Sequence, residues 1–318
     1  MFESDHSNAA NLPDKEGGKS KKAKRKDVTE PLYSPKKVAA AIGASESSLK
    51  RWCDAGVVKA VKTPGGHRKI ARSEVLAFAK RKKYHLRDPL AIGLPDINAV
   101  DFSSIDQAKT SFLTAVIGSD SISSHKILCA LFIQGHSIAA IFDTVVSPVF
   151  FEVASKRKRG EITENQESMA TQICHESLLE LKTIIAQVAA ESPVAIGASL
   201  EGDEFPLVTL GAELCLKDSG WSATSLGANQ SVNSILQSVT DLQPSFIWVS
   251  AVMVKDQASF IARLRELSDS MIKAIKVTVI GEGGMEAEIK KHLPSVHYGK
   301  DFAQLVTFAR FPGEDSGR

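Results

Sequence analysis

Five short apolar segments alternate with five longer segments of helical pattern between residues 193 and 311. Strand–helix units in this order form parallel sheets, because each helix returns the chain to the same edge of the sheet. The apolar runs 247–249 and 277–280 suit strands that are buried on both faces. We therefore expect an α/β domain over residues 192–312, with helices on both faces of the sheet, and a short tail at 313–318. The expected strands lie at 193–200, 221–226, 245–252, 276–281 and 296–299.

The preceding residues, 104–191, have the pattern of four amphipathic helices. Residue types that cap helix N-termini stand at the expected starts, which are Ser104, residues 119–121, Ser137 and Thr163. Thr163 and Gln166 fit a capping box. Pro148 is expected to bend or break the third helix. Short helices are unstable alone, so we expect them to pack as a four-helix bundle.

The net charge of +2 is distributed unevenly. Residues 31–88 hold 14 Lys and Arg against 4 Asp and Glu, whereas residues 89–318 hold 18 against 27. Positive charge concentrated in this way is typical of a domain that binds a polyanion. Residues 1–30, with the basic run 19–26, have the composition of a disordered basic arm. Residues 89–103 are expected to be a linker.

Residues 31–88 carry the pattern of a helix-turn-helix. Ser34 and Pro35 open a first helix that Gly43 ends, and Ser45 caps a second helix that ends near Gly56. Two short helices joined by a turn with glycine form this motif. The second helix would expose Ser47, Lys50 and Arg51, which could then enter the major groove of DNA.

A hairpin is expected directly after the two helices. The alternating residues 57–62 and the segment 67–70 flank Pro64-Gly65, a pair that predicts a type II turn. A basic hairpin beside a recognition helix is a wing that holds the DNA backbone. Its tip would present Thr63, His67, Arg68 and Lys69. Ser73 is expected to cap a third helix that runs to about Lys83.

The segments SSLKRWCDAGVV (47–58) and TPGGHRKI (63–70) closely resemble the DNA-binding domain of the MerR family of transcription regulators. This resemblance implies DNA contacts by Lys50, Arg51, His67 and Arg68, and Tyr33 is carried over in the same way. It also implies a homodimer or higher homo-oligomer on a double-stranded operator, with half-sites about 34–36 Å apart or a multiple of that spacing. A winged helix that contacts protein instead is the alternative, and the positive charge argues against it.

The order of winged helix, helical bundle and α/β domain resembles the MerR-type light-sensing repressors that hold adenosylcobalamin between a helical cap and a cobalamin-binding domain. The resemblance implies a flavodoxin-like sheet of order 2-1-3-4-5. In that family the turn after the first strand reads Asp/Glu-x-His-x-x-Gly, and the His ligates cobalt. Here Phe205 stands at the His and Val208 at the Gly, and phenylalanine offers no lone pair to a metal. Ser250 matches the family's Ser-x-Leu motif, and Gly283 and Gly284 match its paired glycines.

The cap departs from the family as well. The family carries Trp, nine residues and then Glu-His over the corrin, and Arg157, Glu167 and Ser168 stand at these positions here. We therefore expect no cofactor held in the usual way, and a regulatory half that serves oligomerisation, a protein partner or another signal. A cobalamin photoreceptor with unusual cobalt ligation and a protein-only antirepressor are the alternatives. A corrinoid carrier is disfavoured, since it needs an axial ligand and has no use for residues 31–88.

The sequence shows no catalytic constellation and no metal-type spacing of its histidines or of its four cysteines. An enzyme is therefore not expected, and by family analogy repression is favoured over activation. Residues 1–30 have no apolar core, and no apolar run approaches the about 20 residues that span a bilayer. The expected location is the cytoplasm, at the bacterial nucleoid.

Overall fold

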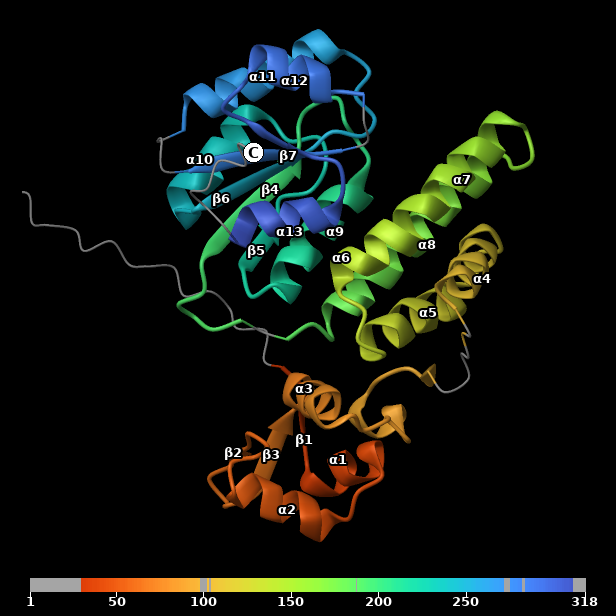
Figure 1. Cartoon of the computed structure of the whole chain (residues 1–318), viewed down its shortest axis with the longest axis vertical. Coiled ribbons are helices and arrows are strands. Elements are labelled where there is room, and N and C mark those ends of the chain that lie inside the picture. The colour runs from red at the N-terminus through yellow and green to blue at the C-terminus, as the bar shows by residue number, and fades with distance from the viewer. Residues whose placement is uncertain are drawn as a thin grey trace, which may run out of the picture. The chain divides into compact units, whose positions relative to one another are not determined.

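The computed structural model describes residues 30–97, 102, 104–186, 188–271, 275–281 and 284–310. The expected basic arm (except Glu30), the expected tail and Gly283 lie outside these residues. In chain order, the described part holds a winged helix-turn-helix, a helical bundle and a parallel α/β sheet (Figure 1), as the sequence predicts.

The N-terminal part is a helix-turn-helix with a small antiparallel sheet. Ser34 accepts a hydrogen bond from the backbone of Lys37 at the start of α1, and Ser45 accepts one from Ser48 at the start of α2, which confirms both predicted caps. The sheet has the order β1-β3-β2, and the pairing of β1 with β3 was not expected. The bounds are β1 (Leu32–Tyr33), α1 (Pro35–Ile42), α2 (Glu46–Asp54), β2 (Val61–Lys62), β3 (Arg68–Ala71), α3 (Arg72–Lys82) and the 3₁₀ turn η1 (Pro89–Ile92).

Two local predictions in this part are wrong. The wing turn places positive φ at Gly66 rather than at Gly65, so it is not type II, which requires positive φ at its third residue. The backbone N–H of Gly66 still closes the turn on the carbonyl of Thr63 at 2.8 Å. The third helix begins at Arg72 with Ala71 at its N-cap and no side-chain cap, because it follows β3 without a loop. Ser73 therefore lies inside the helix.

Within the described residues, the bundle consists of four helices, the third of which runs without a break through α6, η3 and α7. Thr163 and Gln166 form both bonds of the predicted capping box, and Ser104 and Ser137 cap their helices as expected. Asp120 caps the second helix. The bounds are α4 (Ile105–Ile117), α5 (Ser121–Ile133), α6 (Ile138–Ile141), the π-helical turn η3 (Phe142–Val146), α7 (Ser147–Lys158) and α8 (Glu164–Lys182).

Pro148 neither breaks nor ends the third helix. The turn immediately before it, η3, widens to π-helical geometry, and the helix continues as α7. A π turn accommodates a residue that has no N–H to donate and whose ring would clash with the preceding turn. By length and composition alone, residues 138–158 could cross a membrane, yet 44% of that window is buried in the protein. It packs against α4 and α8 of the bundle and, through α6, against α9 (Pro206–Asp218).

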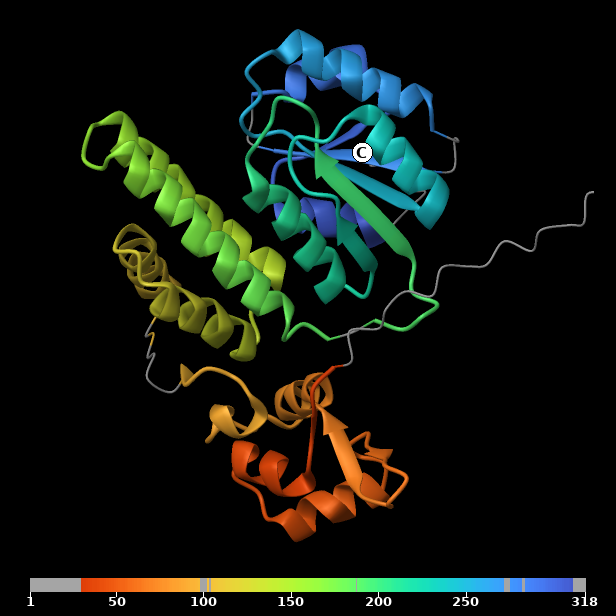
Figure 2. The ribbon, with the colours of Figure 1, turned by 180° about the vertical axis from the view of Figure 1, so that it is seen from behind.

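The α/β domain is a five-stranded parallel sheet of order β5-β4-β6-β7-β8, which is the predicted order 2-1-3-4-5. Helices α9 and α13 cover one face and α10, α11 and α12 the other (Figures 1 and 2). The chain order reverses between β4 and β6, so the topological switch point lies between these two strands. The bounds are β4 (Val194–Ser199), α9 (Pro206–Asp218), β5 (Ser222–Ser225), α10 (Val232–Leu242), β6 (Phe246–Ser250), α11 (Gln257–Asp269), β7 (Lys276–Ile280), α12 (Glu286–His292), β8 (His297–Gly299) and α13 (Phe302–Arg310).

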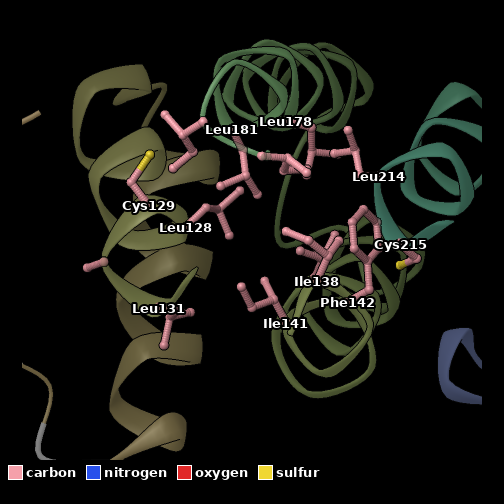
Figure 3. Close-up of a cluster of buried hydrophobic side chains, with 14 of the residues drawn as sticks. Leu128, Cys129, Leu131, Ile138, Ile141, Phe142, Leu178, Leu181, Leu214 and Cys215 are labelled. Carbon is pink, nitrogen blue, oxygen red and sulfur yellow. The ribbon is translucent and has the colours of Figure 1, made fainter. Parts of the chain in front are cut away.

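The bundle core continues without interruption into the α9 face of the sheet domain. Phe142 lies beside Cys215 of α9 in the packed cluster of Figure 3, and its ring is 4.5 Å from that of Phe302 between centroids. A Cβ on Gly211 would lie 2.5 Å from the Phe142 ring, so the absence of a side chain at this position lets the ring pack against the backbone of α9. Two carboxylates join the domains reciprocally: Asp218 of α9 caps α6, and Asp143 of η3 caps α13.

Candidate functional site

A basic groove about 420 Å³ in volume lies between the first turns of α1 and α2 and the wing. It brings together five of the eight residues predicted to contact DNA, and it adds Lys36 of α1, which sequence reasoning missed. Its charged or hydrogen-bonding walls are Lys36, Glu46, Lys50, Thr63, His67, Arg68 and Lys69. A groove with this charge suits a phosphodiester backbone.

The other three predicted contacts lie outside the basic groove. Arg51 and Ser47 are exposed on α2, and the hydroxyl of Ser47 lies 2.9 Å from that of Ser45. Tyr33 is half-buried in β1, and its hydroxyl lies against Gly93, since a Cβ there would come within 2.6 Å of it. The position of Tyr33 therefore gives it a packing role in the free protein.

The recognition helix is held in place by its apolar face. Leu49 of α2 and Ile70 of β3 are completely buried in the core. Trp52 is half-buried and packs on Phe78 and Tyr84, with ring centroids 5.3 and 6.0 Å away. Trp52 is a core residue, as its place on α2 predicts, and the cluster fixes α2 against α3.

Two cations of the groove already have acidic partners on α2. Arg68 binds Oδ1 of Asp54 through Nε at 3.0 Å and through Nη2 at 2.5 Å. Lys50 binds Oε1 of Glu46 at 2.8 Å, one helical turn away, and this ammonium lowers the pKa of the Glu46 carboxyl. The carboxylates were not singled out by sequence reasoning, although Glu46 and Lys50 have the i,i+4 spacing of a helix pair.

The second candidate site lies at the carboxyl edge of the parallel sheet, where folds of this type bind ligands at the switch point. Phe205, at the position of the family's cobalt ligand, is the N-cap residue of α9. Its ring is half-buried and meets Phe150 of α7 edge-on, with centroids 6.2 Å apart. Val208, at the position of the family's glycine, is half-buried in the first turn of α9.

Asp203 closes the switch point between β4 and β6. Its carboxylate is 1% exposed, and it accepts hydrogen bonds from the backbone N–H groups of Phe205 at 3.1 Å and Val252 at 2.8 Å. The loop after β4 is thereby tied to the loop after β6. The acid keeps the place it has in the Asp-x-His pattern, but both of its oxygens bind backbone.

The interior beneath this edge is filled by side chains. Trp248 of β6 is completely buried, and its ring lies over Gly197 of β4, where a Cβ would come within 2.1 Å of it. The indole N–H donates to the hydroxyl of Thr209 on α9 at 3.1 Å. Ser250 is completely buried and its hydroxyl lies 2.8 Å from that of Ser199, so neither faces a cavity.

The lid positions of the cap pair with each other. Arg157 approaches Glu167 at 3.8 Å and Glu164 at 3.6 Å, and all three side chains are partly exposed. Ser168 and Gly284 are exposed. These predicted pocket residues therefore do not converge on one cavity.

The residues of this edge do not fit a corrinoid held through cobalt. Phe205 supplies no donor, and the described residues contain no group of three His, Cys, Asp or Glu side chains able to hold a metal. The cavity between α7 and the carboxyl ends of β7 and β8 measures about 270 Å³. That is below the roughly 300–1,000 Å³ that drug-sized ligands occupy, and a corrinoid is larger than those.

Comparison with known proteins agrees with both halves of this architecture. A family described as "Helix-turn-helix domain" matches residues 32–83. The "HTH-type transcriptional repressor CarH" of Myxococcus xanthus is 26% identical over 140 residues, which are 44% of this chain and 46% of that protein. The match therefore spans less than half of this curated relative.

Among solved structures, the monomethylamine corrinoid protein of Methanosarcina barkeri superimposes with a TM-score of 0.51 at 14% identity. The match covers 65% of this chain and 98% of that one, and at this identity it establishes a common fold. The chain is thus a helix-turn-helix protein with a C-terminal domain of the cobalamin-binding type of fold.

Proposed function

We propose that this protein is a sequence-specific DNA-binding transcription regulator, acting as a repressor in the cytoplasm. The observation that carries the proposal is the basic groove, in which α1, the recognition helix and the wing together present four cations in addition to His67. Phosphates along one strand would lie against Lys36, Lys50, His67 and Lys69, and these contacts would set the register of the protein on DNA. Arg51 and Ser47, exposed on α2, would then read base edges in the major groove.

The similarity to a repressor from Myxococcus xanthus supports repression over activation. A winged helix reads one half-site, so we infer that the protein binds a two-fold operator as a homodimer or higher homo-oligomer. No enzymatic role is part of this proposal, because the basic domain has no use in a carrier or transferase subunit.

We propose that the helical bundle and the sheet domain regulate DNA binding without holding adenosylcobalamin in the family's manner. Three observations support this: Phe205 at the ligand position, the carboxylate of Asp203 bound to two backbone amides, and Trp248 filling the interior below them. The bundle and sheet would then serve assembly, a protein partner or another signal.

Selection of bound duplexes from a random pool by the purified full-length protein tests DNA recognition. We expect enrichment of an inverted repeat. Arg51→Ala should relax one base position at a cost of about 1–3 kcal/mol, whereas Lys158→Ala, which removes an exposed cation of α7, should leave the preference unchanged. Absence of any enriched sequence, or an unaltered preference in Arg51→Ala, would overturn this assignment.

A further inference from the structure

Each of the two ion pairs at the basic groove joins a cation that faces DNA to a carboxylate of the recognition helix itself. Lys50 and Glu46 both line the groove, and Arg68 lines it while Asp54 holds its guanidinium from the other end of α2. In the free protein, two of the four Lys and Arg side chains that line the groove are therefore neutralised before any DNA arrives.

The stability of the fold does not account for these pairs. All four side chains are partly exposed, from 28% for Arg68 to 56% for Asp54, and ion pairs at such positions contribute about 1 kcal/mol or less. Asp54 is moreover the last residue of α2, where an acid lies at the negative end of the helix dipole and weakens the helix. Its position opposes local helix stability, and its carboxylate pairs with Arg68.

The Arg68 pair occupies the donors that a phosphate would use. Nε and Nη2 both donate to Oδ1 of Asp54, and the guanidinium fork offers the same N–H groups to the oxygens of a phosphate. The exposed Asp54 carboxylate can be displaced at little cost, because water replaces the arginine around it. A DNA phosphate that enters the groove would take over the same donors.

We propose that Asp54 and Glu46 act as built-in phosphate mimics, which hold Arg68 and Lys50 until the backbone of a well-fitting DNA site displaces them. This inference rests on the proposed function and adds a specificity device to it. On a loosely docked, non-specific duplex the two acids compete with the phosphates for the same donors, so the net gain from each backbone contact is smaller than on a duplex that fits. The two acids thus lower non-specific affinity and leave the specific complex able to form all its contacts.

The expected size follows from counterion release. Each phosphate contact contributes about 0.9 to the slope of log K against log salt concentration on duplex DNA. Removing both acids should add up to two contacts on non-specific DNA, so the slope should steepen by about 1–2. A slope of about 0.9 per contact means that lowering the salt concentration from 1 M to 0.1 M raises the binding constant about eightfold for each added contact. This factor is the largest gain in non-specific affinity that one added contact should give at 0.1 M salt.

The test compares the full-length protein with Glu46→Gln/Asp54→Asn and Asp54→Asn, using a fluorescent duplex of scrambled sequence titrated at several KCl concentrations. Asp106→Asn is the matched control, because it removes an acid that pairs with Lys109 on α4, away from the groove. Circular dichroism melts establish that every variant folds. We expect tighter non-specific binding and a steeper salt slope for both groove variants, and no change for the control beyond that of the lost charge.

Three other outcomes overturn the inference. If the double variant binds the scrambled duplex with the affinity and the salt slope of the wild type, Asp54 and Glu46 are not phosphate mimics, and the proposed function still holds. Weaker binding by Asp54→Asn means that the acid positions Arg68 for DNA. Failure of all variants and of the wild type to bind any duplex at 50 mM KCl refutes the proposed function and this inference together.

Discussion

Replacement of Asp203 by alanine should destabilise the protein far more than loss of an ordinary helix cap. The Asp203 carboxylate is 1% exposed and accepts two backbone hydrogen bonds, from Phe205 and Val252. Each hydrogen bond to a charged group contributes about 1.5–3 kcal/mol, and alanine leaves both N–H groups without an acceptor. The free energy of unfolding should fall by about 3–5 kcal/mol. Asp203→Asn keeps one acceptor oxygen and should lose about half of that.

The assay is urea unfolding followed by circular dichroism, and Asp256→Ala is the matched control. Asp256 is an exposed N-cap that accepts from the backbone of Ser259, so its loss should cost about 1 kcal/mol. If Asp203→Ala is no more destabilising than Asp256→Ala, the acid does not close the switch point, and the account of this edge is wrong.

Three further predictions concern helix packing, thiol reactivity and retention of a corrinoid. Gly211→Ala should lower the free energy of unfolding by about 1 kcal/mol, although alanine is normally favoured in a helix, because its Cβ would lie 2.5 Å from the Phe142 ring. In a chain that also carries Phe142→Leu, Gly211→Ala should instead raise the free energy of unfolding measured in urea. Native protein at pH 7.5 should alkylate at Cys53 alone, measured by mass spectrometry, since Cys53 is half-buried whereas Cys129, Cys174 and Cys215 are buried. Burial raises the pKa of all four thiols, that of Cys129 to about 12. Labelled Cys174 would contradict this. Phe205→His should not restore corrinoid retention after desalting, because Asp203 and Trp248 still close the edge, and a coloured variant would show that only the ligand was missing.

The arrangement of elements could be predicted because it depends on periodic patterns and local caps. Ser34, Ser45 and Thr163 begin helices in the structure where their side chains can accept backbone N–H groups, and the alternating apolar runs give the five parallel strands. The order of the strands came from family resemblance, since nothing in a strand's own sequence identifies its neighbours.

Features that depend on contacts between distant residues could not be predicted. Serine is a residue type that often caps helices, but α3 follows β3 directly, so Ser73 lies inside the helix. The widening of η3 before Pro148 depends on the bundle around it. Local sequence shows that Phe205 cannot ligate a metal, whereas the packing of Trp248 over Gly197 needs two strands to be adjacent.

In the candidate groove, too, the residue types could be predicted but the contacts between distant residues could not. The sequence indicates which residues are basic and exposed, and five of the predicted contacts line one groove. It does not indicate that Arg68 binds Asp54, because the two residues are 14 positions apart and the turn of the wing lies between them. The pairing of Arg157 with Glu167 likewise requires that α7 and α8 lie antiparallel.

The central claim is that a cobalamin-type fold persists here without the usual hold on the cofactor. Its most direct test is the visible absorption spectrum of the purified full-length protein after incubation with adenosylcobalamin in the dark and desalting, recorded before and after green light. The account predicts a colourless protein whose spectrum light does not alter. Retention of about one corrinoid per chain, with a spectrum that changes on illumination, would contradict it.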